Sequence, residues 1–154
     1  MKRVYIGASM LARDQVAAVY NPDLRSRGYD VVSTWAERDE SDESARAIAR
    51  RDFDDLMTAD TLVVLVDPPS SSGGLATELG IMLGLRSQAP GLKVYAIGRS
   101  RNVFDELADR RFAQWSDFLR WLDVRKQSAA RVAVSTEQGG RPTAEPHEIG
   151  RAHV

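Results

Sequence analysis

The sequence predicts a doubly wound α/β fold: a flavodoxin- or Rossmann-like three-layer sandwich around a mostly parallel sheet of four to five strands. Short apolar runs typical of strands alternate with longer segments of helical period. The run TLVVLVD at 61–67 is almost entirely apolar, as expected for a parallel strand covered on both faces. The length of 154 residues suits one such core.

The first half of the chain yields two strands and two helices. RVYIG at 3–7 predicts a short strand, and the following segment to Gly28 predicts a helix that Pro22 kinks or splits. YDVVSTW at 29–35 predicts the second strand. The acidic residues 36–43 predict a solvated loop, and Ser44 predicts the N-cap of a helix over 44–59.

The second half continues the alternation. A strand over 61–67, a helix over 75–86 and a strand over 92–98 are followed by a short helix and an edge strand near 111–113. A last helix is expected over 116–127, capped by Ser116. We therefore expect an α/β domain over 1–127 and a flexible tail over 128–154, whose His147 and His153 are solvated.

Composition excludes several classes of protein. A net charge of −1 gives no basic field that would attract a nucleic acid polymer. The absence of cysteine removes disulfides, thiolate nucleophiles and cysteine metal sites. Since no apolar run is long enough to cross a bilayer and no leader is evident at the N-terminus, we expect a cytoplasmic protein without a membrane partner.

Two acidic residues interrupt apolar helix stripes. Residues three and four apart share a helix face, and on that basis Glu78 lies with Leu75 and Ile81, and Asp52 lies with Ile48 and Leu56. A carboxylate on a buried face is costly unless it is paired, and burial raises its pKa toward values useful for proton transfer. Two such acids on neighbouring helices predict a site.

Structural roles remain open for both acids. Glu78 follows a helix N-terminus, where negative charge is favourable, and Asp52 is placed to reach water or to pair with Arg50 or Arg51. The serines and glycines at 70–74 offer hydroxyls and backbone N–H groups to an anion. Because carboxyl ends of parallel strands meet at one edge, this loop and the loop after residue 7 are expected to share a rim.

Three blocks together resemble the nucleoside 2-deoxyribosyltransferase family, which includes 2'-deoxynucleoside 5'-monophosphate N-glycosidases. They are VYIGAS at 4–9, RDFDDLMTADTLVVL at 51–65 and SSSGGLATELG at 70–80, in family order. The resemblance implies that Glu78 is the nucleophile, that Tyr5 positions it, and that Asp52 helps to protonate the departing base. It also implies that no metal or organic cofactor is needed, and that the protein forms a homodimer or a larger homo-oligomer.

The resemblance also implies a set of substrate-binding residues: Gly7, Ala8, Ser9, Ser72, Gly73, Gly74 and Asn102. Many transferases carry an aspartate at the position of Ser72, where the monophosphate hydrolases have a serine that contacts the 5'-phosphate. This difference favours nucleotides over free nucleosides. Arg99, Arg101 and Asn102 either serve the site of a neighbouring subunit or form a solvated loop, and Trp35 either borders the base pocket or packs in the core.

The expected function is therefore cleavage or transfer at the N-glycosidic bond of a 2'-deoxynucleoside or its 5'-monophosphate, through a covalent glycosyl-glutamate intermediate. The expected partner is a small nucleoside or nucleotide. One alternative is a module that senses a nucleotide in the same pocket without turnover. Another is a glycosidase acting on cytokinin-type ribonucleotides or NAD.

Overall fold

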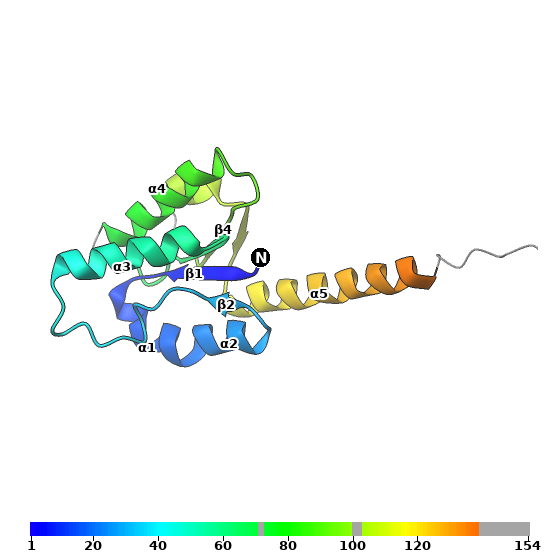
Figure 1. Ribbon diagram of the computed structural model, residues 1–154, viewed down its shortest axis with the longest axis horizontal. Helices are drawn as coiled ribbons and strands as arrows, with labels where there is room; N and C mark the ends of the chain where they lie inside the picture. The colour runs from blue at the N-terminus through cyan, green and yellow to red at the C-terminus, as the bar shows by residue number, and fades with distance from the viewer. Residues whose placement is uncertain (71–72, 100–102, 139–154) are drawn as a thin grey trace, which may run out of the picture. The chain divides into compact units, whose positions relative to one another are not determined.

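The computed structural model describes residues 1–70, 73–99 and 103–138. It contains a five-stranded sheet whose neighbouring strands are all parallel, in the order β2-β1-β3-β4-β5 (Figure 1). The strands are β1 (Arg3–Gly7), β2 (Asp30–Val31), β3 (Thr61–Leu65), β4 (Lys93–Ile97) and β5 (Arg110–Phe112). This order is that of a doubly wound sheet, so the predicted fold class is confirmed.

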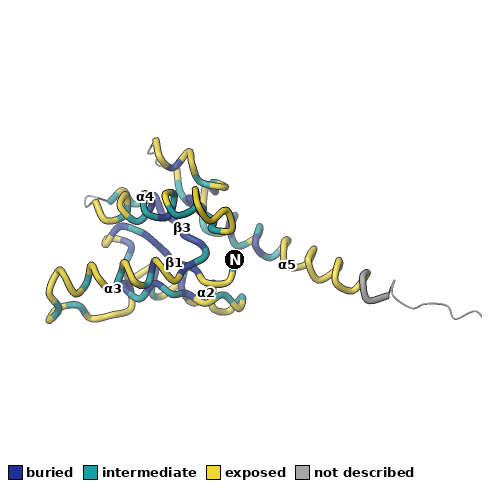
Figure 2. Tube along the Cα trace, turned by 45° about the horizontal axis from the view of Figure 1, so that its top comes forward, coloured by how far each residue is buried: buried dark blue, intermediate teal, exposed yellow. Residues whose placement is uncertain are grey.

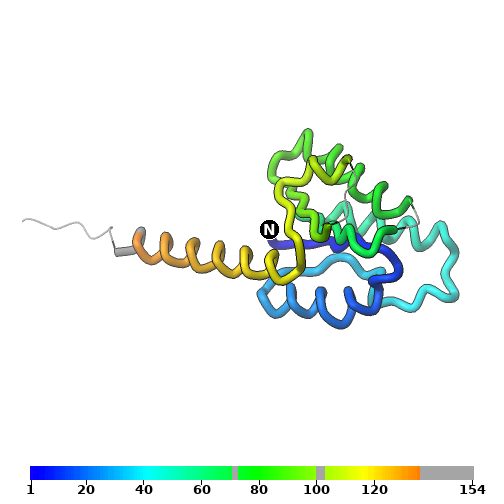
Figure 3. Tube along the Cα trace, turned by 180° about the vertical axis from the view of Figure 1, so that it is seen from behind, coloured from blue at the N-terminus to red at the C-terminus, as the bar shows by residue number. Residues whose placement is uncertain are grey.

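Helices cover both faces of the sheet. The helices α3 (Ala45–Thr58) and α4 (Gly74–Arg86) lie on one side, and α1 (Arg13–Gln15) and α2 (Asn21–Ser26) lie on the other (Figures 1 and 3). Ser44 caps α3 as predicted, because its side chain accepts a hydrogen bond from the backbone N–H of Ala47. Among the described residues, no helix is both long and apolar enough to cross a membrane.

The core is centred on β1 and β3. Every residue of β3 is buried, which explains why its sequence is apolar almost throughout. Figure 2 shows these two strands as the buried interior between helices that are exposed on their outer faces. Burial of a side chain such as Leu62 stabilises the fold by about 1.5–3 kcal/mol.

The carboxyl ends of the central strands lie side by side. Gly7 of β1 is in register with Val64 of β3, and Leu65 is in register with Ile97 of β4. The loops that follow β1 and β3 therefore share one edge of the sheet, as predicted.

The helix after β1 departs from the expected break at Pro22. Its backbone remains helical from Met10 to Ser26 as η1 (Met10–Ala12), α1, the π-helical turn η2 (Val16–Tyr20) and α2. The Asn21 N–H bonds to the Val16 carbonyl, five residues back. A proline ring collides with the carbonyl four residues earlier, and the wider π turn relieves that collision without ending the helix.

The second strand is much shorter than the predicted segment 29–35. The Val32 N–H still donates to the Val4 carbonyl at 2.8 Å, and beyond Val32 side chains replace the backbone pairing with β1. The Ser33 hydroxyl accepts from the Ile6 N–H at 3.0 Å, and the Trp35 indole donates to the Ile6 carbonyl at 2.7 Å. Such local side-chain bonds compete with a strand ladder. Trp35 thus has the core role, and its alternative role at the base pocket is not supported.

Most residues of the acidic loop at 36–43 are exposed, as predicted, but its glutamates also pair with arginines. Glu37 pairs with Arg25 at 2.6 Å and accepts from the Asn21 amide at 2.9 Å. Glu40 pairs with Arg51 at 2.5 Å, and Glu43 pairs with the same arginine. The sequence pattern could not reveal these partners because they lie on separate helices.

The last elements differ from prediction in extent. The 3-10 helix η3 (Val103–Leu107) and the edge strand β5 occur where expected. The helix α5 (Trp115–Gln138) begins before Ser116, which is therefore not its N-cap, and it continues past the expected end at 127. The α/β unit itself spans Met1–Phe118. The domain limit placed at 127 stays a prediction, and His147 and His153 lie outside the described residues.

Candidate active site

A buried tyrosine–glutamate pair joins β1 to α4. The Tyr5 side chain is fully buried, and its hydroxyl donates to Oε1 of Glu78 at 2.7 Å. The alternation of β1 directs Tyr5 toward α4, while Glu78 lies one turn into that helix. Glu78 therefore faces the sheet, as its position on an apolar stripe predicted.

Burial changes the proton affinity of both groups. It raises the pKa of Glu78 to about 7, with the Tyr5 hydrogen bond opposing the rise and the charge of Asp52 adding to it. Burial, followed by the negative charge of Glu78, also raises the pKa of Tyr5 far above its ordinary value. At neutral pH the tyrosine thus keeps its proton and acts as a hydrogen-bond donor, and the glutamate divides between its two protonation states.

Gly7 makes room for the carboxylate. A Cβ atom at this position would lie 2.6 Å from Oε2 of Glu78 and 2.9 Å from a methyl carbon of Leu75. Any side chain at residue 7 would therefore displace the glutamate or the helix that carries it. The structure gives Gly7 a role in placing Glu78, whereas its predicted contact with substrate stays a prediction.

A cavity of about 450 Å³ lies between α3 and α4, and Glu78 forms part of its wall. Its volume falls within the range of small-molecule sites. Most of the lining is apolar, with the polar groups of Asp52, Thr77 and Glu78 among it. The lining residues are Ala45, Ile48, Ala49, Asp52, Phe53, Leu56, Gly74, Thr77, Glu78 and Ile81.

Asp52 shares this cavity with Glu78, so the structure brings together the two acids that the sequence singled out. Burial and the nearby charge of Glu40 raise the pKa of Asp52, while Arg51 acts in the opposite direction. Nε of Arg51 lies 3.8 Å from Oδ1 of Asp52. Asp54, two residues after Asp52 on α3, is exposed and does not line the cavity.

Asp55 lies on α3 outside the lining of the cavity, yet it interacts with two residues of the site, and sequence reasoning gave it no role there. Its Oδ2 accepts from the backbone N–H of Thr34 at 3.2 Å and from the Thr34 hydroxyl at 2.7 Å. Its charge raises the pKa of Tyr5 and of Asp52. The available signal was its position three residues after Asp52 on the same helix face.

The other predicted substrate-binding residues fall into three groups. Gly74 lines the cavity and Gly73 precedes it at the start of α4. Ala8 and Ser9 follow β1, and the Ser9 hydroxyl accepts from the Leu11 N–H at 3.3 Å as the cap of η1. Neither of these two lines the cavity. Ser72 and Asn102 lie outside the described residues.

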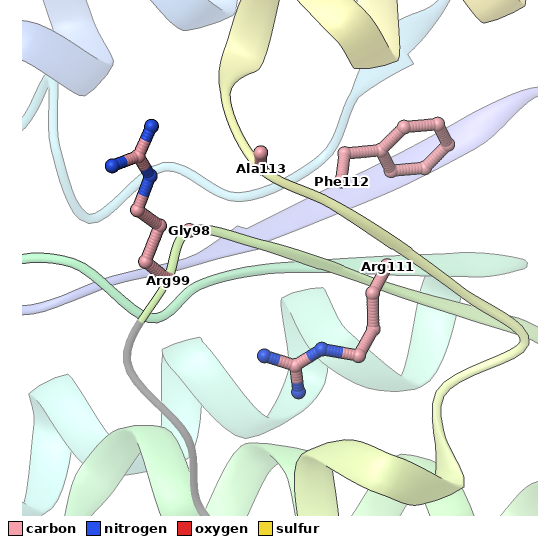
Figure 4. A pocket seen from close by; sticks show the side chains of 5 residues that line it. All are labelled: Gly98, Arg99, Arg111, Phe112 and Ala113. Carbon is pink, nitrogen blue, oxygen red and sulfur yellow. The ribbon is translucent and has the colours of Figure 1, made fainter.

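A second, smaller hollow of about 230 Å³ lies at the carboxyl ends of β4 and β5 (Figure 4). Its lining consists of Gly98, Arg99, Arg111, Phe112 and Ala113. The Arg99 backbone N–H donates to Asp67, and Arg111 lies within ion-pair distance of Asp105 and Glu106. Arg99 thus borders this hollow and not the one that contains Glu78. The question of a role in a neighbouring subunit stays open, and Arg101 lies outside the described residues.

In the described part of the chain, no three His, Cys, Asp or Glu side chains lie close enough together to hold a metal ion. The chemistry that the described residues offer is that of two carboxyl groups and a phenol around an apolar cavity.

Comparisons with known proteins bear on the family and the fold of the chain. The family model described as nucleoside 2-deoxyribosyltransferase matches residues 4–102. Among solved structures, a conserved protein from Enterococcus faecalis aligns with a TM-score of 0.60 at 18% identity, over 81% of this chain and 99% of that one. That likeness shows the shared fold alone. No curated protein matches the chain. Since the family match covers more than half of its residues, the chain belongs to the nucleoside 2-deoxyribosyltransferase family.

Proposed function

We propose that the protein cleaves or transfers the N-glycosidic bond of a 2'-deoxynucleoside or a 2'-deoxynucleoside 5'-monophosphate. The observation that carries this proposal is the buried Tyr5–Glu78 pair in the wall of a cavity that Asp52 also lines. Membership of the nucleoside 2-deoxyribosyltransferase family supports the choice of substrate class.

In the first step, an oxygen of the ionised Glu78 carboxylate forms a bond to C1' of the sugar. The bond from C1' to the base nitrogen breaks, and its electron pair leaves with the base, which takes a proton from Asp52. The product is a glycosyl ester on Glu78. Two carboxyl groups that share the work in this way are the basis of retaining glycosidases.

In the second step, an acceptor attacks C1' and releases Glu78. If the acceptor is water, Asp52 takes its proton and the products are free base and a deoxyribose or its 5-phosphate. If the acceptor is the nitrogen of another base, Asp52 takes the proton from that nitrogen and the sugar is transferred to it. Tyr5 holds the Glu78 oxygen through the cycle, because its hydrogen bond fixes the carboxylate against β1.

The substrate is expected to carry a 5'-phosphate, which the hydroxyl and N–H groups around Ser70 and Gly73 would bind near the N-terminus of α4. The mostly apolar cavity between α3 and α4 suits the flat face of a nucleobase. The protein is proposed to act as a homo-oligomer, without a metal or organic cofactor, in the cytoplasm.

The direct test is to incubate the protein with each deoxynucleoside and each 5'-monophosphate, with and without a second free base, and to separate the products by chromatography. We expect release or exchange of base. Glu78→Gln and Asp52→Asn should each reduce the rate by at least about a hundredfold. Asp54→Asn is the matched control, since Asp54 is exposed on the same helix.

The same experiment separates the proposal from its alternatives. Tight binding of a nucleotide with no base released from any substrate would indicate a sensing module. Release of base from ribonucleotides or NAD, and not from deoxyribose substrates, would indicate a different glycosidase. Intact-mass detection of a sugar adduct on the wild type, absent from Glu78→Gln, would support the covalent intermediate.

A further inference from the structure

Arg51 is held on α3 by two acids of the preceding loop. Its side chain is 14% exposed, and Nη2 lies 2.5 Å from Oε1 of Glu40 while Nη1 contacts Glu43. The guanidinium fork is rigid and each charged contact restricts it further. The cation is thus fixed at one place beside the cavity, next to Asp52.

The contact between Arg51 and Asp52 is an ion pair without a hydrogen bond. Nε and Oδ1 are 3.8 Å apart, and each is a buried polar atom with no hydrogen-bond partner among the described residues. Leaving both atoms unpaired is unfavourable, so the pair is not explained as a simple stabilising bridge. Its geometry keeps a positive charge beside the acid without binding the acid closely.

We propose that Arg51, which Glu40 and Glu43 fix in place, is a positioning residue that keeps a positive charge beside the Asp52 carboxyl at the cavity and controls whether that carboxyl carries a proton. The consequence for catalysis rests on the proposed function, in which Asp52 gives a proton to the base and later takes one from water. A group with both duties must change protonation state readily, and its charged surroundings decide how readily.

The charges around Asp52 oppose one another, which makes this control testable. Negative charge favours the protonated form of Asp52 and positive charge favours the ionised form. The titratable groups that interact with Asp52 come from the loop, from α3, from β1 and from α4: Arg38, Glu40, Arg51, Asp55, Tyr5 and Glu78. Arg51 and Glu40 contact each other and act on Asp52 with opposite sign.

The first experiment measures Asp52 itself. The side-chain carboxyl of each aspartate is followed by ¹³C NMR against pH, and the Asp52 signal is assigned by its absence from Asp52→Asn. We expect Arg51→Gln to shift the Asp52 titration to higher pH, because a positive charge is lost. We expect Glu40→Gln to shift it to lower pH, because a negative charge is lost.

Arg50→Gln is the matched control, since Arg50 precedes Arg51 on the same helix and is exposed; its Asp52 titration should equal that of the wild type. If Arg51→Gln fails to fold by circular dichroism, Arg51→Met, which also lacks the positive charge, takes its place, and Glu40→Gln is measured beside it. Unchanged Asp52 titration in the folded variants, or shifts of the same sign in Arg51→Gln and Glu40→Gln, would overturn the proposal.

The second experiment links this control to turnover. Because the first step needs a protonated Asp52, the limb of the kcat profile that reports Asp52 should move to higher pH in Arg51→Gln and to lower pH in Glu40→Gln. A purely structural role would reduce the rate without moving the limb. If the Asp52 titration shifts in the variants but no substrate reacts, the proposed function fails and the control of Asp52 by Arg51 stands. If base is released but neither the Asp52 titration nor the rate profile moves, the proposed function stands and the control of Asp52 fails.

Discussion

Glu78 shows how a side chain suited to a reaction can weaken the fold that contains it. Its ordinary pKa is 4.5, and burial raises the pKa in the folded protein to about 7. Between these two values the folded state binds more protons than the unfolded state, so stability falls as pH rises through that window. Above it, the folded protein contains a buried carboxylate that the unfolded chain would solvate.

Replacing this carboxyl by a neutral amide should therefore stabilise the protein. We expect Glu78→Gln to raise the free energy of unfolding by about 3 kcal/mol at pH 8 and by little at pH 4, since one pKa unit corresponds to about 1.4 kcal/mol. Urea unfolding at the two pH values measures the difference. Equal effects at both would show that the ionised form of Glu78 is not penalised by burial.

The Tyr5 hydroxyl is expected to act on the same equilibrium. Its hydrogen bond to Glu78 favours the ionised form, so Tyr5→Phe should raise the pKa of Glu78 further and move the acidic limb of the rate profile to higher pH. At pH 7 we expect a loss of about tenfold in kcat/KM. Tyr29→Phe, at a half-buried tyrosine outside the cavity, should leave the profile unchanged.

At the scale of a single element, Gly7 of β1 and Gly84 of α4 differ in the space that each leaves for a side chain. A Cβ at Gly7 would collide with Glu78 and Leu75, whereas one at Gly84 of α4 would meet nothing within 4 Å. We expect Gly7→Ala to destabilise the protein by about 1–3 kcal/mol and to abolish activity. Gly84→Ala should stabilise α4 by about 0.5–1 kcal/mol and leave activity intact. Thermal unfolding and base release measure both.

The carboxylate of Asp60 links the N-terminal ends of β1 and β3 through hydrogen bonds. Asp60 accepts from the backbone N–H groups of Lys2 and Arg3 at 2.9 and 3.1 Å, and from the Thr61 hydroxyl at 2.7 Å. Burial opposes ionisation of Asp60, yet these hydrogen bonds and the N-terminal charge lower its pKa below 3.8. Its stabilisation is thus present above pH 3.8 and is lost as pH falls through the lowered value.

Asp60→Asn should reduce the free energy of unfolding by about 1–3 kcal/mol at pH 6, because an amide offers one acceptor oxygen in place of two. The difference from wild type should shrink below pH 3. Asp42→Asn, at an exposed position of the loop after β2, is the control. Urea unfolding across this range provides the measurement, and a constant difference at all pH values would contradict the assignment.

At the scale of the whole molecule, apolar periodicity carried most of the information about architecture. The run around Leu62 and Val63 predicted a strand covered on both faces, and the alternation of strands and helices predicted the parallel sheet, because both follow from burial alone. The stripe on α4 likewise predicted that Glu78 faces inward. These features depend on residues near one another in sequence.

Features that depend on distant partners were not predictable in this way. The strand β2 is short because Ser33 and Trp35 bond to Ile6 through their side chains. The glutamates of the acidic loop at 36–43 pair with Arg25 of α2 and Arg51 of α3. Side chains that cross between elements leave no periodic mark in the sequence. For the same reason, the sequence could suggest Asp52 and Glu78 as partners and Arg51 as a neighbour of Asp52, but it could not reveal the contacts of Arg51 with Glu40 and Glu43.

The near-neutral titration of Glu78 has a thermodynamic consequence for ligand capture. Near pH 7 a solution of the free protein is a mixture of two forms that differ by one hydrogen ion, and a ligand that prefers one form must shift that mixture. The calorimetric heat of association should then depend on the ionisation enthalpy of the buffer. The sign of that dependence would report which protonation form of the Glu78 carboxyl a bound ligand selects.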